Sequence, residues 1–487
     1  MARIAGILIG SIILIVAIGC GGGSSTPAPT PTPPTQIFPN DESLAQTPPV
    51  KLGTSGGNAN DLGAKVCCIG TLGSLWTHVG TTNPVVLSNN HVLDRSGQGA
   101  AGEAINQPLQ LVCTATGAPA PLTVAHLTQG ATLKPVANET TGPCQGNTTP
   151  LCGHSPSNVD AGIAEITAGQ VDLSGNILDL GPVGTTSIAA APPSATIGVP
   201  SLNESVGKSG RTTGLTCSNI QSLNLTILVN YDASCGAASP AFTAYFTNQV
   251  TISGGAFSAG GDSGSLVVDT GTSRAVGLLY GGNSTSTVAN PIQDVITAFG
   301  GAAAFSIVGG ADHAVSCAHT ATAGATQVRT AQAALLPQER QRVTAVQQRR
   351  AAQLMQDKSI RSVTVGASAD NPNEGALLIQ ASSDNIPRVP PSIDGVRTRL
   401  VFDTAANPHF TIGAQEMDRA TIVKEAHVGS LMGQPGIQGV GVSMSADNPA
   451  ETAVSIYVVK GVAHAPIPAV IDGVRTRIFE GDRFRAY

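Results

Sequence analysis

Three short segments carry the side chains that nucleophilic catalysis needs. GGDSGSLVVD places Ser263 in a glycine-rich turn before an apolar run, PVVLSNNHVLD places His91 after an apolar run, and NVDAGIAEI places Asp160 before another. A serine hydroxyl is a weak nucleophile until a neighbouring base accepts its proton, and a histidine base must be oriented by a third group. Together the segments indicate acyl-transfer chemistry, whereas a serine between glycines is by itself a common turn.

In this order along the chain, the segments resemble the His, Asp and Ser motifs of the chymotrypsin-like (trypsin-like) serine proteases. Subtilisins and α/β-hydrolases carry the same residues in other orders. LSNNHVL, VDAGIAEI and GDSGS each fit one motif, and GKSGRTTGLT at 207–216 resembles a glycine-rich strand and turn of bacterial members. The resemblance covers about residues 60–305, roughly half of the chain.

The resemblance implies a role for each residue. Ser263 Oγ would attack the scissile carbonyl, and His91 would take the proton and later deliver it to the leaving amine, while Asp160 orients His91. Backbone N–H groups of Gly261 and Ser263 would form the oxyanion hole. Asp262 is a weaker candidate for the acid than Asp160, because adjacent residues of an extended turn point apart.

Structural alternatives stay open for all three residues: a turn serine, a strand-end histidine bonded to the backbone, and a turn-capping aspartate. The remaining histidines lie in none of these motifs and are interpreted as structural or surface residues: His78, His126, His154, His313, His319, His409, His427 and His464.

The resemblance also raises the questions of activation and specificity. In many family members a freshly cleaved amino terminus pairs with the aspartate before the catalytic serine, here Asp262, and a lipidated N-terminus would have no free amine for this role. By analogy, SGGAFSAGG and GLLYGGNSTST line the primary specificity pocket, and neither contains an acid. We therefore expect a small or apolar residue before the cleaved bond.

A β-rich scaffold is expected to hold these residues. Short Val/Ile/Leu runs separated by Gly, Asn, Asp and Pro turns recur from residue 64 to 300, a pattern typical of antiparallel barrels. The resemblance implies a mainly β, two-barrel chymotrypsin-like protease domain over residues 59–310. His91 and Asp160 would come from the first six-stranded barrel and Ser263 from the second.

The N-terminal sequence indicates export. Residues 1–20, MARIAGILIGSIILIVAIGC, have one arginine and an apolar run that ends in small residues, as in a signal segment. AIGC resembles the lipobox of bacterial lipoproteins, so we expect lipidation of Cys20 and attachment to a bacterial membrane; an uncleaved transmembrane helix is the alternative. Residues 21–58, rich in Pro, Thr, Ser and Gly, are predicted to form an extended tether.

Cysteine use agrees with an oxidising compartment. Eight cysteines remain besides Cys20, an even set that predicts disulfides in the first folded unit. Their connectivity cannot be read from the sequence, and the short loops favour Cys217–Cys235 and Cys144–Cys152. The absence of CxxC pairs argues against a metal site, and we expect no metal and no cofactor.

The last third of the chain is a duplication. SADNP occurs at 368–372 and 445–449, and IDGVRTR occurs at 393–399 and 471–477. Each copy begins with a helical pattern and continues with strand-like runs, which predicts two α+β repeat modules over 325–410 and 411–487 that pack together. The arginines of IDGVRTR, Arg397, Arg399, Arg475 and Arg477, could bind anions, but a solvated strand face is the interpretation we favour.

Composition limits the remaining choices. Only 11% of the residues are charged, and the arginine-rich run at 339–350 lies in a region with a small net charge, so we expect no nucleic-acid partner. The sequence predicts an exported serine endopeptidase whose partners are a protein or peptide substrate and, through its lipid anchor, a membrane. A non-catalytic surface binding protein with the same fold and an esterase-type acyl hydrolase are the alternatives, and a structural surface protein is a further one.

Overall fold

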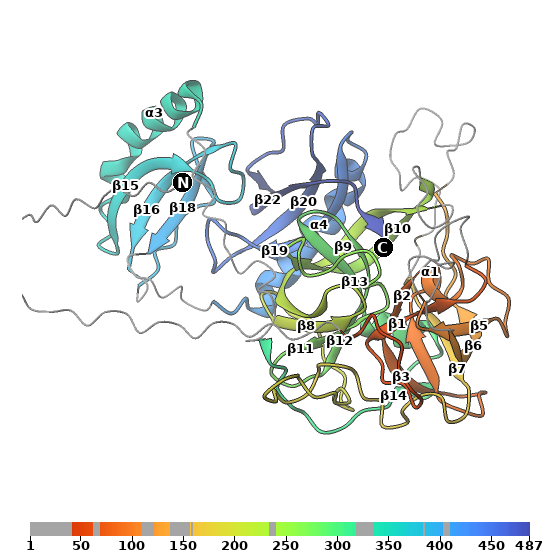
Figure 1. Cartoon of the computed structure of the whole chain (residues 1–487). Coiled ribbons are helices and arrows are strands. Elements are labelled where there is room, and N and C mark those ends of the chain that lie inside the picture. The colour runs from red at the N-terminus through yellow and green to blue at the C-terminus, as the bar shows by residue number, and fades with distance from the viewer. Residues whose placement is uncertain are drawn as a thin grey trace, which may run out of the picture. The chain divides into compact units, whose positions relative to one another are not determined.

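Antiparallel β-strands build the part of the chain that carries the three motifs (Figure 1). The computed structural model describes residues 41–61, 69–109, 121–136, 156, 159–232, 240–317, 335–382, 385–402 and 410–487. All of them lie in one compact unit, Ile37–Tyr487. The signal segment, Cys20 and the proposed Cys144–Cys152 disulfide lie outside the described residues. Among the described helices, none has the length and apolar character needed to cross a membrane.

The first barrel precedes residue 170. Its strands are β1 (Thr54–Asn58), β2 (Gly70–Leu72), β3 (Ser74–His78), β4 (Val85–Ser88), β5 (Ala104–Gln107), β6 (Leu122–Gly130) and β7 (Gly162–Ile166), in the order β3-β4-β7-β6-β5-β1-β2. Strands β2 and β3 form one strand interrupted at Gly73, whose N–H donates to Leu87 O and closes the ring. The barrel therefore has six strands, and β14 (Phe305–Ile307) pairs with β3.

The second barrel is a closed ring of six strands. It contains β8 (Ser205–Gly210), β9 (Gly214–Asp232), β10 (Pro240–Ser253), β11 (Leu266–Asp269), β12 (Ala275–Gly282) and β13 (Ser286–Pro291), followed by the helix α2 (Ile292–Ala298). The order is β10-β13-β12-β11-β8-β9, and pairing of β9 with β10 closes it. The prediction of a mainly β, two-barrel chymotrypsin-like fold is confirmed.

The predicted tether extends too far along the chain. The sequence predicts a tether through residue 58, but Val50 and Leu52 are fully buried and β1 pairs with both β2 and β5. The glycines that suggested a linker are there because the strands approach closely: a Cβ at Gly56 would lie 2.5 Å from Leu72 Cγ. The folded part therefore begins before residue 58.

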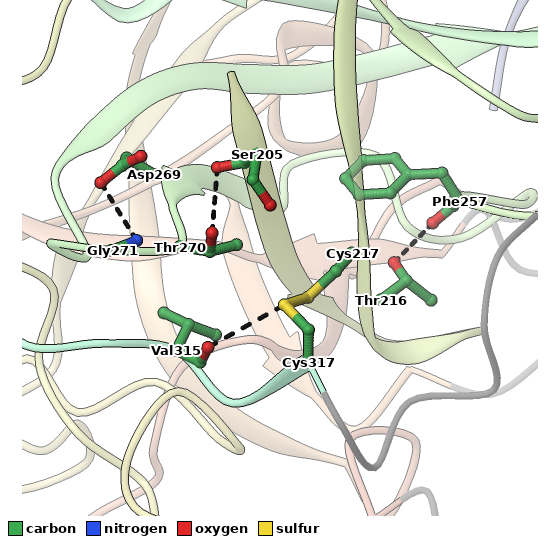
Figure 2. The surroundings of a disulfide bond; sticks show 9 residues. All are labelled: Ser205, Thr216, Cys217, Phe257, Asp269, Thr270, Gly271, Val315 and Cys317. Carbon is green, nitrogen blue, oxygen red and sulfur yellow. Dashed lines mark hydrogen bonds between the residues drawn. A yellow bond between two sulfur atoms is a disulfide. The ribbon is translucent and has the colours of Figure 1, made fainter. Parts of the chain in front are cut away.

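One disulfide joins the second barrel to the segment that leaves it. Cys217, near the start of β9, is bonded to Cys317 across 100 residues of sequence (Figure 2). The predicted Cys217–Cys235 pair is therefore wrong. Nearby, Val315 N donates to Thr270 O and Thr216 Oγ1 donates to Phe257 O. The bond fixes the chain to the barrel immediately before the described residues stop at 317.

Two copies of the same element order make up the rest of the chain. The first contains α3 (Pro337–Leu354), β15 (Ile360–Ala367), β16 (Gly375–Ala381), β17 (Ser392–Ile393) and β18 (Val396–Phe402), and the second contains α4 (Ala414–Met432), β19 (Ile437–Met444), β20 (Thr452–Val459), β21 (Val470–Ile471) and β22 (Val474–Gly481). In each, the long third strand runs parallel to the second. That the two copies are separate modules stays a prediction.

The duplicated motifs contact each other. Arg397 donates to Thr476 O and Arg475 donates to Thr398 O, each at 2.8 Å, and both arginines are only 2% exposed. Ser368 donates to Asp447, and Ser445 returns the same bond to Asp370, both at 2.6 Å. The expected solvated strand face is therefore wrong for these two arginines, because the repeats use them to bind each other.

The second copy also continues the sheet of the second barrel. Strand β19 pairs antiparallel with β9, with Val440 opposite Thr226. Lys424 of α4 is buried and donates to Thr226 Oγ1 at 2.9 Å. The Tyr457 hydroxyl lies 2.7 Å from both Ser222 Oγ and Thr251 Oγ1. Both backbone pairing and buried polar contacts therefore connect this copy to the barrel.

Candidate active site

His91 and Asp160 form a hydrogen-bonded pair in the first barrel. His91 lies on the four-residue helix α1 (Asn90–Leu93), which follows β4, and Asp160 precedes β7. His91 Nδ1 lies 2.6 Å from Asp160 Oδ2, and the His91 backbone N–H donates to Asp160 Oδ1 at 3.2 Å. A carboxylate beside Nδ1 favours the proton on that nitrogen, which leaves Nε2 as the atom available for proton transfer.

Asp160 is fully buried and held from several sides. Tyr231 on β9 donates its hydroxyl to Asp160 Oδ2 at 2.8 Å. Asn290 on β13 accepts from the Asp160 backbone N–H at 2.9 Å and donates to its carbonyl at 3.0 Å, while Asn89 donates to the same carbonyl at 2.7 Å. Because Tyr231 and Asn290 belong to the second barrel, both barrels fix the acid.

This environment changes the proton affinity of the histidine. Burial alone lowers the pKa of His91, but the charge of Asp160 and the hydrogen bonds to Asp160 and to the Tyr487 main-chain oxygen more than offset it, so the pKa is raised. Burial raises the pKa of Tyr231 well above its ordinary value, and the Asp160 charge adds to this effect. Tyr231 is therefore a neutral donor across the physiological pH range.

Ser263 lies in the turn before β11, at the contact between the barrels. Thr71 on β2 holds this turn in place with two hydrogen bonds: its N–H donates to Ser263 O at 2.7 Å and its hydroxyl donates to Gly261 O at 2.9 Å. Gly264 has φ +94°, and a Cβ there would overlap Ser88 Oγ. Ser263 Oγ is buried and donates to Tyr280 O at 3.1 Å; among the described contacts it has no hydrogen bond to His91.

Two backbone donors in the serine turn have no acceptor among the described residues. Gly261 has φ +100°, a conformation that favours glycine. No acceptor in the described part of the chain takes a hydrogen bond from the Gly261 or Ser263 N–H, whereas the intervening Asp262 N–H donates to Ala259 O. Paired free N–H groups beside a serine can stabilise a developing oxyanion.

A buried ion pair stabilises the turn that carries Ser263. Asp262 Oδ2 lies 3.5 Å from Lys208 Nζ, with both side chains fully buried. Asp262 also accepts from the backbone N–H groups of Thr212, Thr213 and Ala259. Burial lowers the pKa of Lys208, and the negative charge of Asp262 opposes that effect. Lys208 therefore offsets the negative charge of Asp262 inside the protein.

The ring nitrogen of His91 that faces away from Asp160 contacts residue 487 of the same chain. His91 Nε2 lies 2.9 Å from the main-chain oxygen of Tyr487. Figure 1 accordingly marks the C end near α1. Nε2, the ring nitrogen that would face a serine nucleophile, therefore already has a partner.

The structure brings His91, Asp160, Gly261 and Ser263 to one region, with Ser263 Oγ oriented toward Tyr280 O rather than His91 Nε2, and Cys20 lies outside the described residues. Sequence reasoning missed Tyr231, Thr71, Lys208 and Tyr487. The glycines of GKSGRTTGLT indicate a strand and turn, but nothing in this segment marks its lysine as buried. The contact of His91 with Tyr487 spans 396 residues of sequence, and no local motif could reveal it.

A cluster of carboxylates lies away from this site, beside β1 and β8. Ligand atoms of Asp41, Glu42 and Asp179 lie within 4.8 Å of one another. Burial, then the Asp179 charge, raises the pKa of Glu42 to about 8, and Ser209 donates to its Oε1 at 3.0 Å. Protonation of Glu42 explains how these acids lie side by side, and the cluster is not evidence of a metal site.

Comparison with known proteins gives a fold likeness and no close relative. No family model and no curated protein sequence matches the chain. Thermobifida fusca protease A aligns with a TM-score of 0.32 and 16% identity over 54% of this chain and 99% of that one. A glutamic acid-specific serine protease gives 0.32 and 17% over 53% and 100%, and Nocardiopsis protease 0.32 and 14% over 53% and 98%. The strand order of the barrels, rather than these values, identifies the fold.

Proposed function

We propose that the chain is a serine endopeptidase that hydrolyses peptide bonds through Ser263, His91 and Asp160. The observation that carries the proposal is the convergence of three features where the barrels meet: a His91–Asp160 pair at 2.6 Å, a serine in a fixed turn, and two backbone N–H groups that have no acceptor in the described part of the chain. A serine with a purely structural role in a turn would need neither the His91–Asp160 pair nor the two backbone N–H groups.

The reaction would proceed in two halves. Ser263 Oγ attacks the substrate carbonyl carbon while His91 Nε2 takes the hydroxyl proton, and the oxyanion lies against the N–H groups of Gly261 and Ser263. The C–N bond then breaks as His91 protonates the leaving amine, giving an acyl-enzyme. Water, deprotonated by His91, hydrolyses the ester. Asp160 holds the imidazole in position and stabilises its charged form.

Two changes must precede the first step. Ser263 Oγ has to turn from Tyr280 O toward His91 Nε2, and the Tyr487 main-chain oxygen has to leave that nitrogen. The first is a single side-chain rotation, and the second needs movement of the chain. The proposal therefore treats the described arrangement as a resting state.

A fluorophosphonate probe, which reacts with activated serines, tests the proposal. The chain with residues 485–487 deleted should be labelled and should cleave peptide bonds, and its Ser263→Ala variant should do neither. Ser306→Ala, which removes an exposed hydroxyl on β14, is the matched control and should keep both. Absence of labelling in a folded chain would contradict the proposal and favour a binding protein. Labelling with turnover of esters but not peptides would favour the esterase.

We also propose that the enzyme works outside the cytoplasm, in the bacterial cell envelope, attached through lipid on Cys20. The signal-like segment, the lipobox-like AIGC and the even cysteine set support this location. Cells fed an alkyne fatty acid should yield labelled chain, and Cys20→Ser should abolish that label. A label that survives the substitution would contradict the anchor without affecting the catalytic proposal.

A further inference from the structure

The last residues of the chain bind between two strands of the second barrel. Strand β23 (Arg485–Ala486) pairs antiparallel with β12, with Gly281 opposite Ala486 and Gly282 opposite Arg485, and it runs parallel to β9 beside Asn230. The Tyr487 N–H donates to Tyr280 O at 3.3 Å. Addition of an extended segment to a sheet edge is a general mode of peptide binding.

The Tyr487 side chain fits its surroundings closely. It packs against a buried apolar cluster of the second barrel that includes Phe257 and Leu279. Its hydroxyl hydrogen-bonds with the side chain of Ser258, and Ser258 Oγ lies 2.5 Å from Thr287 Oγ1. A Cβ at Gly282 would overlap the Tyr487 hydroxyl, so the glycine leaves room for the ring.

The main chain of the same residue lies at the reacting groups. The Tyr487 main-chain oxygen is 2.9 Å from His91 Nε2, and its N–H shares the Tyr280 carbonyl with Ser263 Oγ. In this register the main chain of a tyrosine contacts His91 and shares an acceptor with the Ser263 hydroxyl. A peptide bound as residues 485–487 are bound would present the bond that follows its tyrosine for cleavage.

The preceding residues anchor the segment. Phe484 is 1% exposed, its N–H donates to Gln438 Oε1 at 3.1 Å, and its carbonyl accepts from Asn230 N at 3.0 Å. Its ring meets Tyr457 edge-on at 5.7 Å. Since Gln438 and Tyr457 lie on β19 and β20, the copy that pairs with β9 delivers the segment to the site.

We propose that β9, β12 and the residues around Tyr487 form a peptide-binding site selective for a tyrosine before the cleaved bond, and that residues 485–487 occupy it as the chain's own inhibitory ligand. This inference rests on the proposed function and names its substrate class. It replaces the expectation of a small or apolar residue, because the polar end of the ring has its own partner in Ser258. Asp262 does not make the site select a basic residue, since Lys208 neutralises it.

Binding to an inactive chain tests the inference separately from catalysis. A fluorescent acetyl-Phe-Arg-Ala-Tyr peptide is titrated against the full chain carrying Ser263→Ala, with residues 485–487 present, deleted, or carrying Tyr487→Gly. A tethered ligand acts at a high effective concentration, so both tail variants should bind the peptide at least about tenfold more tightly than the intact chain. Arg483→Ala, an exposed change just before the anchor, is the matched control and should bind as weakly as the intact chain.

The peptide is also varied. Acetyl-Phe-Arg-Ala-Gly should bind the tail-deleted chain at least about tenfold more weakly, because it lacks the ring. Equal binding of the Tyr and Gly peptides, or equal binding to the intact and tail-deleted chains, would overturn the inference. Selective binding without fluorophosphonate labelling would contradict only the proposed function. Labelling and peptide cleavage that do not depend on the tail would contradict only the inference.

Discussion

At the scale of single residues, His91 makes the binding of residues 485–487, the tail, depend on pH. Its Nδ1 faces Asp160 and its Nε2 faces the Tyr487 oxygen, so only the doubly protonated ring can donate to both. The other group that faces the ring as a charge is Asp61, whose pKa is raised by burial, and Tyr231 stays neutral. The raised pKa of His91 means that tail binding is favoured below that pKa and is lost as the pH rises through it.

We therefore expect the inhibition to weaken at alkaline pH. The ratio of peptidase activity between the tail-deleted and intact chains should fall several-fold from about pH 6 to about pH 9, because deprotonated His91 cannot donate to the tail. The measurement is kcat/KM for one tyrosine peptide across that range. A ratio that stays constant or grows with pH would contradict the argument.

Tyr231 is a positioning residue, since it acts on His91 through Asp160. Tyr231→Phe removes a buried hydrogen bond to a carboxylate, which should cost about 1–3 kcal/mol of unfolding free energy. With one donor fewer, Asp160 should attract the imidazole proton more strongly, so the acid limb of the kcat/KM profile should move to higher pH.

The pH profile separates positioning from packing, because a merely structural residue would leave the limb in place. Tyr280→Phe is the matched control for stability: its buried hydroxyl has no hydrogen-bond partner in the described part of the chain, so its loss should cost little. A Tyr231→Phe chain with an unchanged acid limb would show that the hydroxyl only fills space.

At the scale of the elements, the Lys208–Asp262 pair fastens β8 to the serine turn. Lys208→Met leaves Asp262 buried without its cation, which should cost about 3–5 kcal/mol. Lys51→Met removes an exposed lysine and should change stability by less than about 0.5 kcal/mol. Urea unfolding in the Ser263→Ala background measures both without self-digestion. A Lys208→Met chain as stable as the parent would exclude this role for the pair.

The elements also show what the sequence could reveal. Runs such as PVVLS became fully buried strands, since apolar stretches bounded by turn residues have few other solutions. The His91, Asp160 and Ser263 motifs could be recognised because each lies within about ten residues. By contrast, residues 41–58 looked like a linker because strand-to-strand contact also selects glycine, and the Cys217–Cys317 bond spans 100 residues that local spacing could not bridge.

At the scale of the whole molecule, one sheet runs from the second barrel into the C-terminal region. The pairing of β9 with β19 fixes the position of this region relative to the candidate active site. Phe484, which accepts a hydrogen bond from Asn230 on β9, then fixes the position of the tail. Inhibition should then depend on a contact remote from His91. The chain could be activated by releasing this contact as well as by removing the tail.

Thr226→Val tests that dependence. The change keeps the side-chain shape but removes the hydroxyl that accepts from the buried Lys424 ammonium, which should weaken the pairing of β9 and β19 by about 1–3 kcal/mol. Because the tail competes less well when β19 is loosely held, the variant should cleave a tyrosine peptide several-fold faster than the intact chain. Thr364→Val, the same change at an exposed position of β15, should leave the rate unchanged.

Combining Thr226→Val with deletion of residues 485–487 tests the route of this effect more directly. If Thr226 acts only through the tail, then Thr226→Val should have no effect on the rate once residues 485–487 are gone, so the two changes should be strongly non-additive. Additive effects would mean that β9 reshapes the active site directly, through Tyr231 and its bond to Asp160. That result would leave the peptide-binding site intact and remove the C-terminal region from its control.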